Sequence, residues 1–337
     1  MDLNLTPEQR DLTEAMADLF GKRSGPDQVR ACLHTQFDEQ LWRHLTDVGL
    51  LSLALPEEHG GLGRALLDAA LVCAEGGRRL ACVPLAESIA AVRLLARLGP
   101  VAEPALAAAL DGTVTVLAIR PAEDGVVARQ PWGAAADAVV ALDGEDLVLA
   151  PGRLPHPIDS LGFLGLGDRP VRPAEGRTVL ASGDAAVAAF TTAQAEARVL
   201  TAAVLGGLAA QALQIACDYA RQRHQFGVPI GSFQAVQQQL AGCCIDVEGT
   251  QLLTYETAWL MDQDAPDAET RALMAFLHAA TVAVQTSERA LHVHGGYGFT
   301  TEYDIHLYLR RAKGISVSQG DPQALWEQIG RSLVREA

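Results

Sequence analysis

The sequence predicts a mainly helical protein with a small β module in the middle of the chain. Three observations support this fold class: apolar residues recur at helical spacing near both ends, short apolar runs alternate with turn residues between them, and the order is helices, β module, helices. We therefore expect an N-terminal helical domain (residues 1–111), a reduced middle β domain (112–192) and a C-terminal bundle of four helices (193–337).

The N-terminal part opens with a helix-start signal. Thr6 is suited to cap the helix, Pro7 to occupy its first position and Gln9 to close a capping box. A second helix carries apolar residues up to Val48 and stops at Gly49. After a loop, helical patterns resume at about residue 65 and continue to Leu110.

The middle part has the pattern of short strands. An extended run starts near Val114, and the apolar runs 138–142 and 147–149 flank Asp143-Gly144, which predicts a β-hairpin. Closely spaced prolines after Pro151 exclude a helix there, and residues 178–180 form a last strand.

The last third returns to helices. We expect long helices at about 195–223, 232–262 and 267–293. A shorter helix begins at Asp321-Pro322, where an acidic cap precedes a proline at the first helical position.

Composition excludes several classes of protein. The net charge is −15, which argues against binding of a phosphate backbone, because nucleic-acid affinity depends on clustered Lys and Arg. The segment Met1–Glu8 has neither a basic nor an apolar signal-peptide region, and no apolar run is expected to reach the roughly 18 residues that a membrane span requires. We expect a soluble, cytoplasmic protein with no membrane insertion.

The cysteines and histidines do not predict a metal site. The six cysteines have no C-x-x-C spacing, so we expect reduced, buried side chains. His292 and His294 lie close together in the sequence, but no third ligand is placed nearby, which favours a packing or hydrogen-bonding role for them.

Three motifs in register resemble the acyl-CoA dehydrogenase family. They are Leu55–Gly63 (LPEEHGGLG), Arg221–Gln234 (RQRHQFGVPIGSFQ) and His294–Tyr303 (HGGYGFTTEY), the last followed by Leu309–Lys313 (LRRAK). The resemblance covers nearly the whole chain and implies the family fold: a helical domain, a β domain and a four-helix bundle.

The resemblance implies FAD as cofactor, shared across a subunit interface. Arg223 matches a family arginine on the pyrophosphate, for which a guanidinium fork is suited. Arg223 taken alone could also pair with a surface carboxylate. The other residues implied to contact the cofactor are Gln225, Phe226, Gln234, His292 (where the family usually has a glutamine), Gly295 and Gly296.

The catalytic base of the family is missing from both of its usual positions. Gln319 occupies one of them, and a neutral amide cannot take a proton near pH 7. Ala197 occupies the other, before Arg198. Glu196 is adjacent, but a step of one residue turns about 100° around a helix, so we expect this carboxylate to face elsewhere.

The β module also departs from the family. The hydroxyl-bearing loop that holds the flavin ring in family members is replaced by Ile119–Gly125 (IRPAEDG). The pyrophosphate-side residues are thus present, whereas the ring-side residues and the base are absent.

This asymmetry resembles the short, degenerate subunit of heteromeric (α2β2) acyl-CoA dehydrogenases of actinobacteria, several of which act on steroid side-chain CoA thioesters. The resemblance implies a longer partner subunit carrying the base, an acyl-CoA substrate and an electron-transfer acceptor. Two alternatives remain open: a homomeric dehydrogenase with a displaced base such as Glu196, and a flavin-free scaffold of the same fold.

Overall fold

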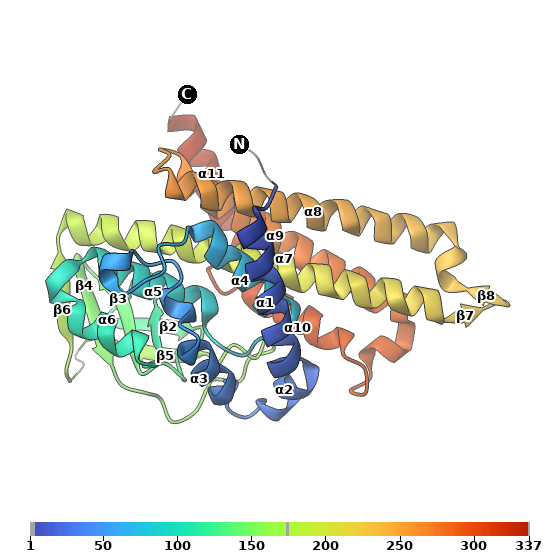
Figure 1. The fold of residues 1–337 in the computed structure, drawn as a ribbon, viewed down its shortest axis with the longest axis horizontal. Coiled ribbons are helices and arrows are strands. Elements are labelled where there is room, and N and C mark those ends of the chain that lie inside the picture. Colours follow the sequence, from blue (N-terminus) through green and yellow to red (C-terminus); the bar gives the residue numbers. More distant parts are fainter. Residues whose placement is uncertain (1–3, 173–174, 336–337) are drawn as a thin grey trace.

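The protein is built around three long, roughly aligned helices (Figure 1). The computed structural model describes residues 4–172 and 175–335. Residues 1–3 lie outside the described residues. They are part of the segment Met1–Glu8, in which no signal peptide is expected from the sequence. The N-terminal helices and the β module pack against one half of the long helices, and the other half projects away from them (Figure 1).

The N-terminal part is helical, as predicted. Its helices are α1 (Pro7–Arg23), α2 (Pro26–Ala31), α3 (Glu39–Asp47), α4 (Leu66–Arg78), α5 (Leu85–Arg97) and α6 (Glu103–Leu110), with 3₁₀ turns η1 (Leu50–Ser52), η2 (Glu57–His59) and η3 (Gly99–Val101). The capping box is confirmed: the Gln9 amide N–H donates to Thr6 Oγ1 at 3.2 Å, and the Thr6 amide N–H donates to Gln9 Oε1 at 3.1 Å. The short helix α2 was not predicted from the sequence.

The middle part contains two sheets. The larger one has the order β1-β3-β4-β6, with β1 parallel to β3 and the other pairs antiparallel. The predicted hairpin is confirmed, since Val140 of β3 lies opposite Leu149 of β4. The strands of this sheet are β1 (Thr115–Leu117), β3 (Ala138–Asp143), β4 (Asp146–Pro151) and β6 (Thr178–Ser182).

A second, two-stranded sheet was not predicted. It pairs β2 (Val126–Gln130) with β5 (Gly167–Pro170). The charged Arg169 interrupts the hydrophobic pattern of β5, so the sequence gives no strand signal there. The side chain of Arg169 is nevertheless buried, and its guanidinium donates to the carbonyls of Gly133 at 2.9 Å and Ala136 at 2.7 Å.

The C-terminal part has one more helix than expected. Its elements are α7 (Asp184–Gln222), strands β7 (His224–Gln225) and β8 (Val228–Pro229), η4 (Ile230–Ser232), α8 (Gln234–Asp262), α9 (Ala268–His294), η5 (Gly295–Phe299), α10 (Ile305–Ser316) and α11 (Pro322–Arg335). The expected start of the first long helix near 195 was wrong: α7 begins at Asp184, because the alanine-rich stretch before 195 continues the helix. The boundary expected at 192 therefore falls inside α7.

Two glycines let α4 and α7 cross with their backbones in contact. A Cβ atom added to Gly77 would lie 2.0 Å from the carbonyl oxygen of Val204, and one added to Gly207 would lie 1.9 Å from that of Ala74. No side chain larger than hydrogen fits at either position without a shift of the helices. This crossing fixes the N-terminal helices against the bundle.

Helix α7 is long and apolar enough, by length and composition, to span a membrane. The expectation that no stretch reaches this length was wrong, since one 18-residue window has a mean hydropathy of 1.7. That window is 67% buried within the protein, as in a core helix of a bundle.

The six cysteines are free thiols. Cys73, Cys82 and Cys243 are buried, as predicted, whereas Cys244 is exposed because it points away from its neighbour on α8.

Candidate functional site

A hollow of about 640 Å³ lies at the end of the bundle that projects from the rest of the protein. It is formed where α7 ends, where the β7–β8 hairpin turns back, and where α9 meets η5. The residues that line it are Tyr219, Arg223, Gln225, Ile230, His292, Val293, His294, Gly295, Gly296 and Tyr297. Five of the seven residues predicted to contact the cofactor are therefore brought together.

Local backbone bonds hold the two walls of this hollow in place. The Arg223 amide caps α7 by donating to the Tyr219 carbonyl at 2.8 Å, and the Ile230 amide donates to the Arg223 carbonyl at 2.7 Å, which closes the hairpin. On the other wall, Gly295 ends α9 with φ of 60°, a conformation that favours glycine. A Cβ on Gly295 or Gly296 would meet nothing of this chain within 4 Å, so both face open space.

Arg223, Gln225 and His292 are the lining residues whose polar side chains are exposed and open to a ligand. Within the described ranges, the side chains of Arg223, Gln225 and His292 make no hydrogen bond or ion pair. The alternative role considered for Arg223 was an ion pair with a surface carboxylate. The structure places such a pair at Arg221 instead, whose guanidinium lies 2.9 Å from the carboxylate of Asp218.

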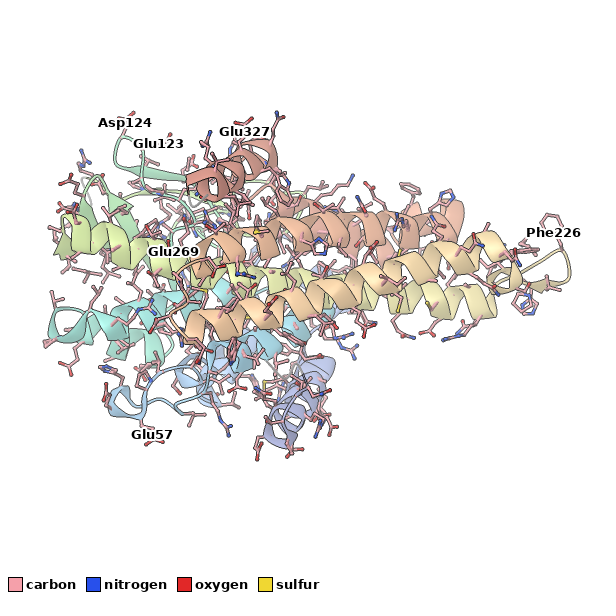
Figure 2. The ribbon with its side chains drawn as sticks, turned by 90° about the horizontal axis from the view of Figure 1, so that it is seen from above. Glu57, Glu123, Asp124, Phe226, Glu269 and Glu327 are labelled. Carbon is pink, nitrogen blue, oxygen red and sulfur yellow. The ribbon has the colours of Figure 1, made fainter. Side chains whose placement is uncertain are left out.

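Phe226 and Gln234 lie outside the lining. Phe226 is 92% exposed at the tip of the hairpin, the part of the protein farthest from the β module (Figure 2). Its φ is 54°, and its ring meets that of Phe233 edge to face at 6.2 Å. Gln234 is the exposed first residue of α8.

His294 belongs to an aromatic cluster beneath the hollow. Its ring lies 4.1 Å from that of Tyr219 and 4.7 Å from that of Tyr303, and its Nδ1 is 2.7 Å from the Ala290 carbonyl oxygen. Burial lowers the pKa of His294, which favours the neutral ring and a packing role. No group of three His, Cys, Asp or Glu side chains suited to a metal occurs in the described part of the chain.

We find no carboxylate at positions 319 and 197, where the sequence resemblance predicts the family's base. Gln319 is buried in the loop after α10, and its Oε1 accepts from Arg198 Nε at 3.4 Å. Ala197 is buried on α7 beside Arg198.

Glu196 is sealed on another face of α7. Its carboxylate accepts from Arg93 Nη2 at 2.9 Å and from Arg97 at 2.7 and 3.0 Å, and its side chain is 3% exposed. Burial raises the pKa of Glu196, but Arg93 and Arg97 together outweigh burial and lower it overall. Glu196 and Arg198 are two residues apart on a helix and so point in nearly opposite directions, which directs Glu196 away from Gln319.

The segment 119–125 lies against the sheet. The Ala122 amide donates to the Leu142 carbonyl at 2.7 Å, and Arg120 Nη2 donates to the Ala128 carbonyl at 2.8 Å. These two bonds fix the segment to the β module, whereas the side chains of Glu123 and Asp124 are exposed.

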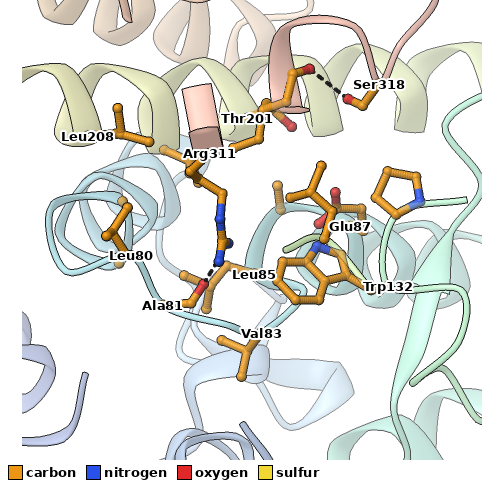
Figure 3. Close-up of a pocket in the computed structure, with 17 residues that line it drawn as sticks. Leu80, Ala81, Val83, Leu85, Glu87, Trp132, Thr201, Leu208, Arg311 and Ser318 are labelled. Carbon is orange, nitrogen blue, oxygen red and sulfur yellow. Dashed lines mark hydrogen bonds between the residues drawn. The ribbon is translucent and has the colours of Figure 1, made fainter. Parts of the chain in front are cut away.

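A second, enclosed hollow of about 40 Å³ lies where the three parts of the chain meet (Figure 3). Glu87 of α5, Trp132 of the β module and Arg311 of α10 surround it. Burial raises the pKa of Glu87 to about 7. The volume of this hollow admits a few water molecules, and buried Arg311 Nε has no partner among the described residues. Glu87 and Trp132 were not predicted from the sequence, because no local pattern signals a contact between distant segments.

Comparison with known proteins agrees with this arrangement. The family model of the acyl-CoA dehydrogenase N-terminal domain matches residues 6–102, and that of the C-terminal domain matches residues 187–334. The fold is that of an acyl-CoA dehydrogenase, and the chain belongs to the acyl-CoA dehydrogenase family.

Three similar proteins illustrate the relationship. Acyl-CoA dehydrogenase IpdE2 of Mycobacterium tuberculosis is 34% identical over 96% of both chains. The ChsE4–ChsE5 complex from Mycobacterium tuberculosis superposes with a TM-score of 0.88 at 28% identity, covering 99% of both chains. The steroid acyl-CoA dehydrogenase Tcur3481–Tcur3483 superposes with a TM-score of 0.87 at 28% identity over 98% of both chains.

The family depends on FAD, and the hollow at the end of the bundle fits part of that cofactor. An exposed guanidinium, an amide and an imidazole converge there and have no partner among the residues that the structure describes, and two glycines that face open space lie beside them. Such donors suit a pyrophosphate.

Proposed function

We propose that this chain is the FAD-sharing, base-free subunit of a heteromeric acyl-CoA dehydrogenase. Its hollow at the end of the bundle holds the pyrophosphate and adenine of an FAD whose ring lies in a longer partner subunit. That partner supplies the carboxylate base.

The observation that carries this proposal is the clustering of Arg223, Gln225, His292 and Gly295-Gly296 around one open hollow, while both base positions lack a carboxylate. Three polar side chains, none of them paired with another described residue, face this one open space and are available to a ligand.

The distance along α7 adds a second argument. The helix has 39 residues, which at about 1.5 Å per residue makes it roughly 58 Å long. The β module packs near its start and Arg223 follows its end, so the two lie at opposite ends of the molecule (Figure 1). One dinucleotide cannot reach both within a single chain.

The roles of the residues follow from their chemistry. Arg223 donates paired, charge-assisted hydrogen bonds to phosphate oxygens, and Gln225 and His292 donate beside it. Phe226, exposed at the hairpin tip, covers apolar surface of the partner or of the adenosine. When bound, FAD supplies the hydride acceptor for α,β-desaturation of the acyl thioester.

We also propose a bulky steroid side-chain CoA thioester as the substrate. The support is similarity to a steroid acyl-CoA dehydrogenase and to a complex of two different chains, each at 28% identity over nearly the whole chain.

Absorbance near 450 nm tests the proposal. The chain purified alone is expected to be colourless and inactive, because a half-site leaves the flavin ring without contacts. Co-expressed with a longer acyl-CoA dehydrogenase that carries an intact ring loop and a glutamate base, it is expected to purify as a yellow complex that oxidises an acyl-CoA.

Two outcomes would contradict this assignment. A yellow, active preparation of the chain alone would establish a homomeric enzyme. If the complex forms but this chain contributes nothing to its retention of FAD, the chain is a flavin-free scaffold.

A further inference from the structure

The enclosed hollow where the three parts of the chain meet is lined by one acidic and one basic side chain (Figure 3). Glu87 comes from α5 of the N-terminal part, Arg311 from α10 of the C-terminal part, and Trp132 from the β module. The other residues that line the hollow, including those of α7, are not ionisable and are mainly apolar. The carboxyl group of Glu87 therefore lies at a mostly apolar space that all three parts share.

Glu87 has no counter-charge in direct contact. Within the described ranges, no Lys, Arg or His nitrogen lies within 4 Å of its carboxyl oxygens. Arg311 lines the same hollow, but its Nη1 donates to the Ala81 carbonyl at 3.3 Å and its Nη2 donates to Cys82 Sγ at 3.1 Å. An ionised carboxylate in an enclosed, mostly apolar space is unfavourable without a paired cation, so the neutral acid is favoured here.

A comparison of two acids of the interior shows what the missing ion pair does. At Glu196, two contacting arginines outweigh burial and lower the pKa of the carboxyl group overall. At Glu87, burial is the largest influence and raises the pKa to about 7, against smaller opposing effects of its own backbone amide, Trp132 and Arg311. Burial, and to a lesser extent Glu87, raises the pKa of the Cys73 thiol on α4.

The walls of the hollow include bulky residues in a strained backbone conformation. Leu80 and Trp132, which both line the hollow, have φ of 55° and 59°. Large side chains rarely adopt such positive φ, and they do so only where the surrounding structure enforces it, often at functional sites. One such constraint is the Trp132 amide, which donates to the Leu164 carbonyl at 2.6 Å. The junction is therefore held in a conformation that depends on its packing.

We propose that Glu87 makes this hollow a proton-dependent joint between the three parts of the chain. While the acid is neutral, the walls stay packed around a small hollow. When the acid releases its proton to solvent, the carboxylate draws water into the hollow and loosens the contacts of α5 with the β module and with α10. The joint is independent of FAD sharing, because it lies within one chain and apart from the hollow of Arg223.

The joint predicts a pH dependence of stability with a defined sign. The folded pKa of Glu87 lies above its ordinary value of 4.5, so its contribution to stability is fully present below pH 4.5 and is lost as the pH rises through about 7. Glu87→Gln stays neutral at every pH. From pH 5 to pH 8, we expect its folding constant to rise roughly fifty- to hundredfold relative to that of the unmodified chain, measured by urea unfolding. Glu14→Gln, at an exposed carboxylate of α1, is the control and should change little.

Trp132 reports on the hollow itself. The chain is labelled with 5-fluorotryptophan, and the Trp132 resonance is assigned with Trp132→Phe. We expect this resonance to titrate near pH 7 in the unmodified chain and to lose that titration in Glu87→Gln. Trp42, whose indole donates to the Gly112 carbonyl at 2.8 Å, is the internal control and should respond to pH in the same way in both proteins.

Hydrogen exchange reads the loosening. After correction for the intrinsic effect of pH, the protection of amides in α5 and α10 should fall between pH 5 and pH 8 in the unmodified chain and stay constant in Glu87→Gln.

Three results would overturn the joint: a Trp132 titration near pH 7 that persists in Glu87→Gln, equal ratios of the folding constants at pH 5 and pH 8, or equal protection of α5 and α10 at both pH values. If Glu87→Gln does not fold, the chain is labelled with ¹³C at the glutamate carboxyls, and the Glu87 resonance is assigned by its loss in Glu87→Asp. A midpoint near pH 7 then supports the joint, and a midpoint below pH 5.5 overturns it.

Discussion

Two charged side chains on or beside α7, Arg223 and Glu196, differ in whether they are available to a ligand. At one end Arg223 is exposed and makes no ion pair with any described residue. Nearer the other end Glu196 is sealed between two arginines, although the sequence alone presents both as residues capable of chemistry. The difference lies in their partners, because a charge that already has well-placed counter-charges is unavailable to a ligand.

Replacing Arg223 by Ala is expected to lower the FAD content of the assembled complex. Charged hydrogen bonds contribute about 1.5–3 kcal/mol, so the affinity for FAD should fall roughly ten- to hundredfold. The measurement is the ratio of flavin to protein after gel filtration. Arg221→Ala is the matched control, since Arg221 is bonded to Asp218. Flavin content that stays the same in Arg223→Ala would contradict the pyrophosphate role.

Replacing Glu196 by Gln is expected to destabilise the isolated chain by about 3–5 kcal/mol, because it leaves the guanidinium of Arg93 without a full counter-charge in the interior. The pKa of Glu196 is lowered in the folded state. Its contribution to stability is therefore present above its ordinary value of 4.5 and is lost as the pH falls through the lower folded value.

Urea unfolding from pH 7 down to a pH below the folded pKa of Glu196 measures both effects. The variant should show a flatter acid dependence than the unmodified chain. Glu58→Gln, at an exposed carboxylate, is the control and should change little. A loss of activity in Glu196→Gln without a loss of stability would instead indicate a base.

At the scale of elements, the crossing of α4 and α7 holds the N-terminal helices against the bundle. Gly207→Ala is expected to cost about 1–3 kcal/mol or more, because the added Cβ would overlap the Ala74 carbonyl oxygen. Gly242→Ala, on α8, is the matched control: nothing lies within 4 Å of its Cβ, so a gain of about 0.5–1 kcal/mol is expected from helix propensity. Equal effects of the two changes on the urea midpoint would contradict the close crossing.

At the scale of the whole molecule, the hollow with Arg223 and the β module lie at opposite ends (Figure 1). If this chain provides only the pyrophosphate side, an assembly of two copies of it with two partners contains two complete FAD sites. We therefore predict two FAD per four chains, measured by native mass spectrometry and by absorbance after release of the flavin. Four FAD per assembly would show that this chain also holds a ring.

The sequence by itself determined the order of the three parts, the capping box at Thr6, the β3–β4 hairpin and the family. These features depend on local periodicity, capping and turn chemistry, which neighbouring residues encode. It also singled out the residues that gather at the end of the bundle, because their motifs are contiguous in the chain.

The tertiary structure alone decided which charges are available. Arg93 and Arg97 bind Glu196 although they lie about 100 residues away in the sequence. In strand β5, the buried guanidinium of Arg169 is stabilised by hydrogen bonds to backbone carbonyls. Glu87, by contrast, has no contacting counter-charge, because no basic group in the described parts of the chain comes within 4 Å of it. A charge in the interior is governed by its counter-charges and by desolvation, and both depend on segments that meet only in the folded chain.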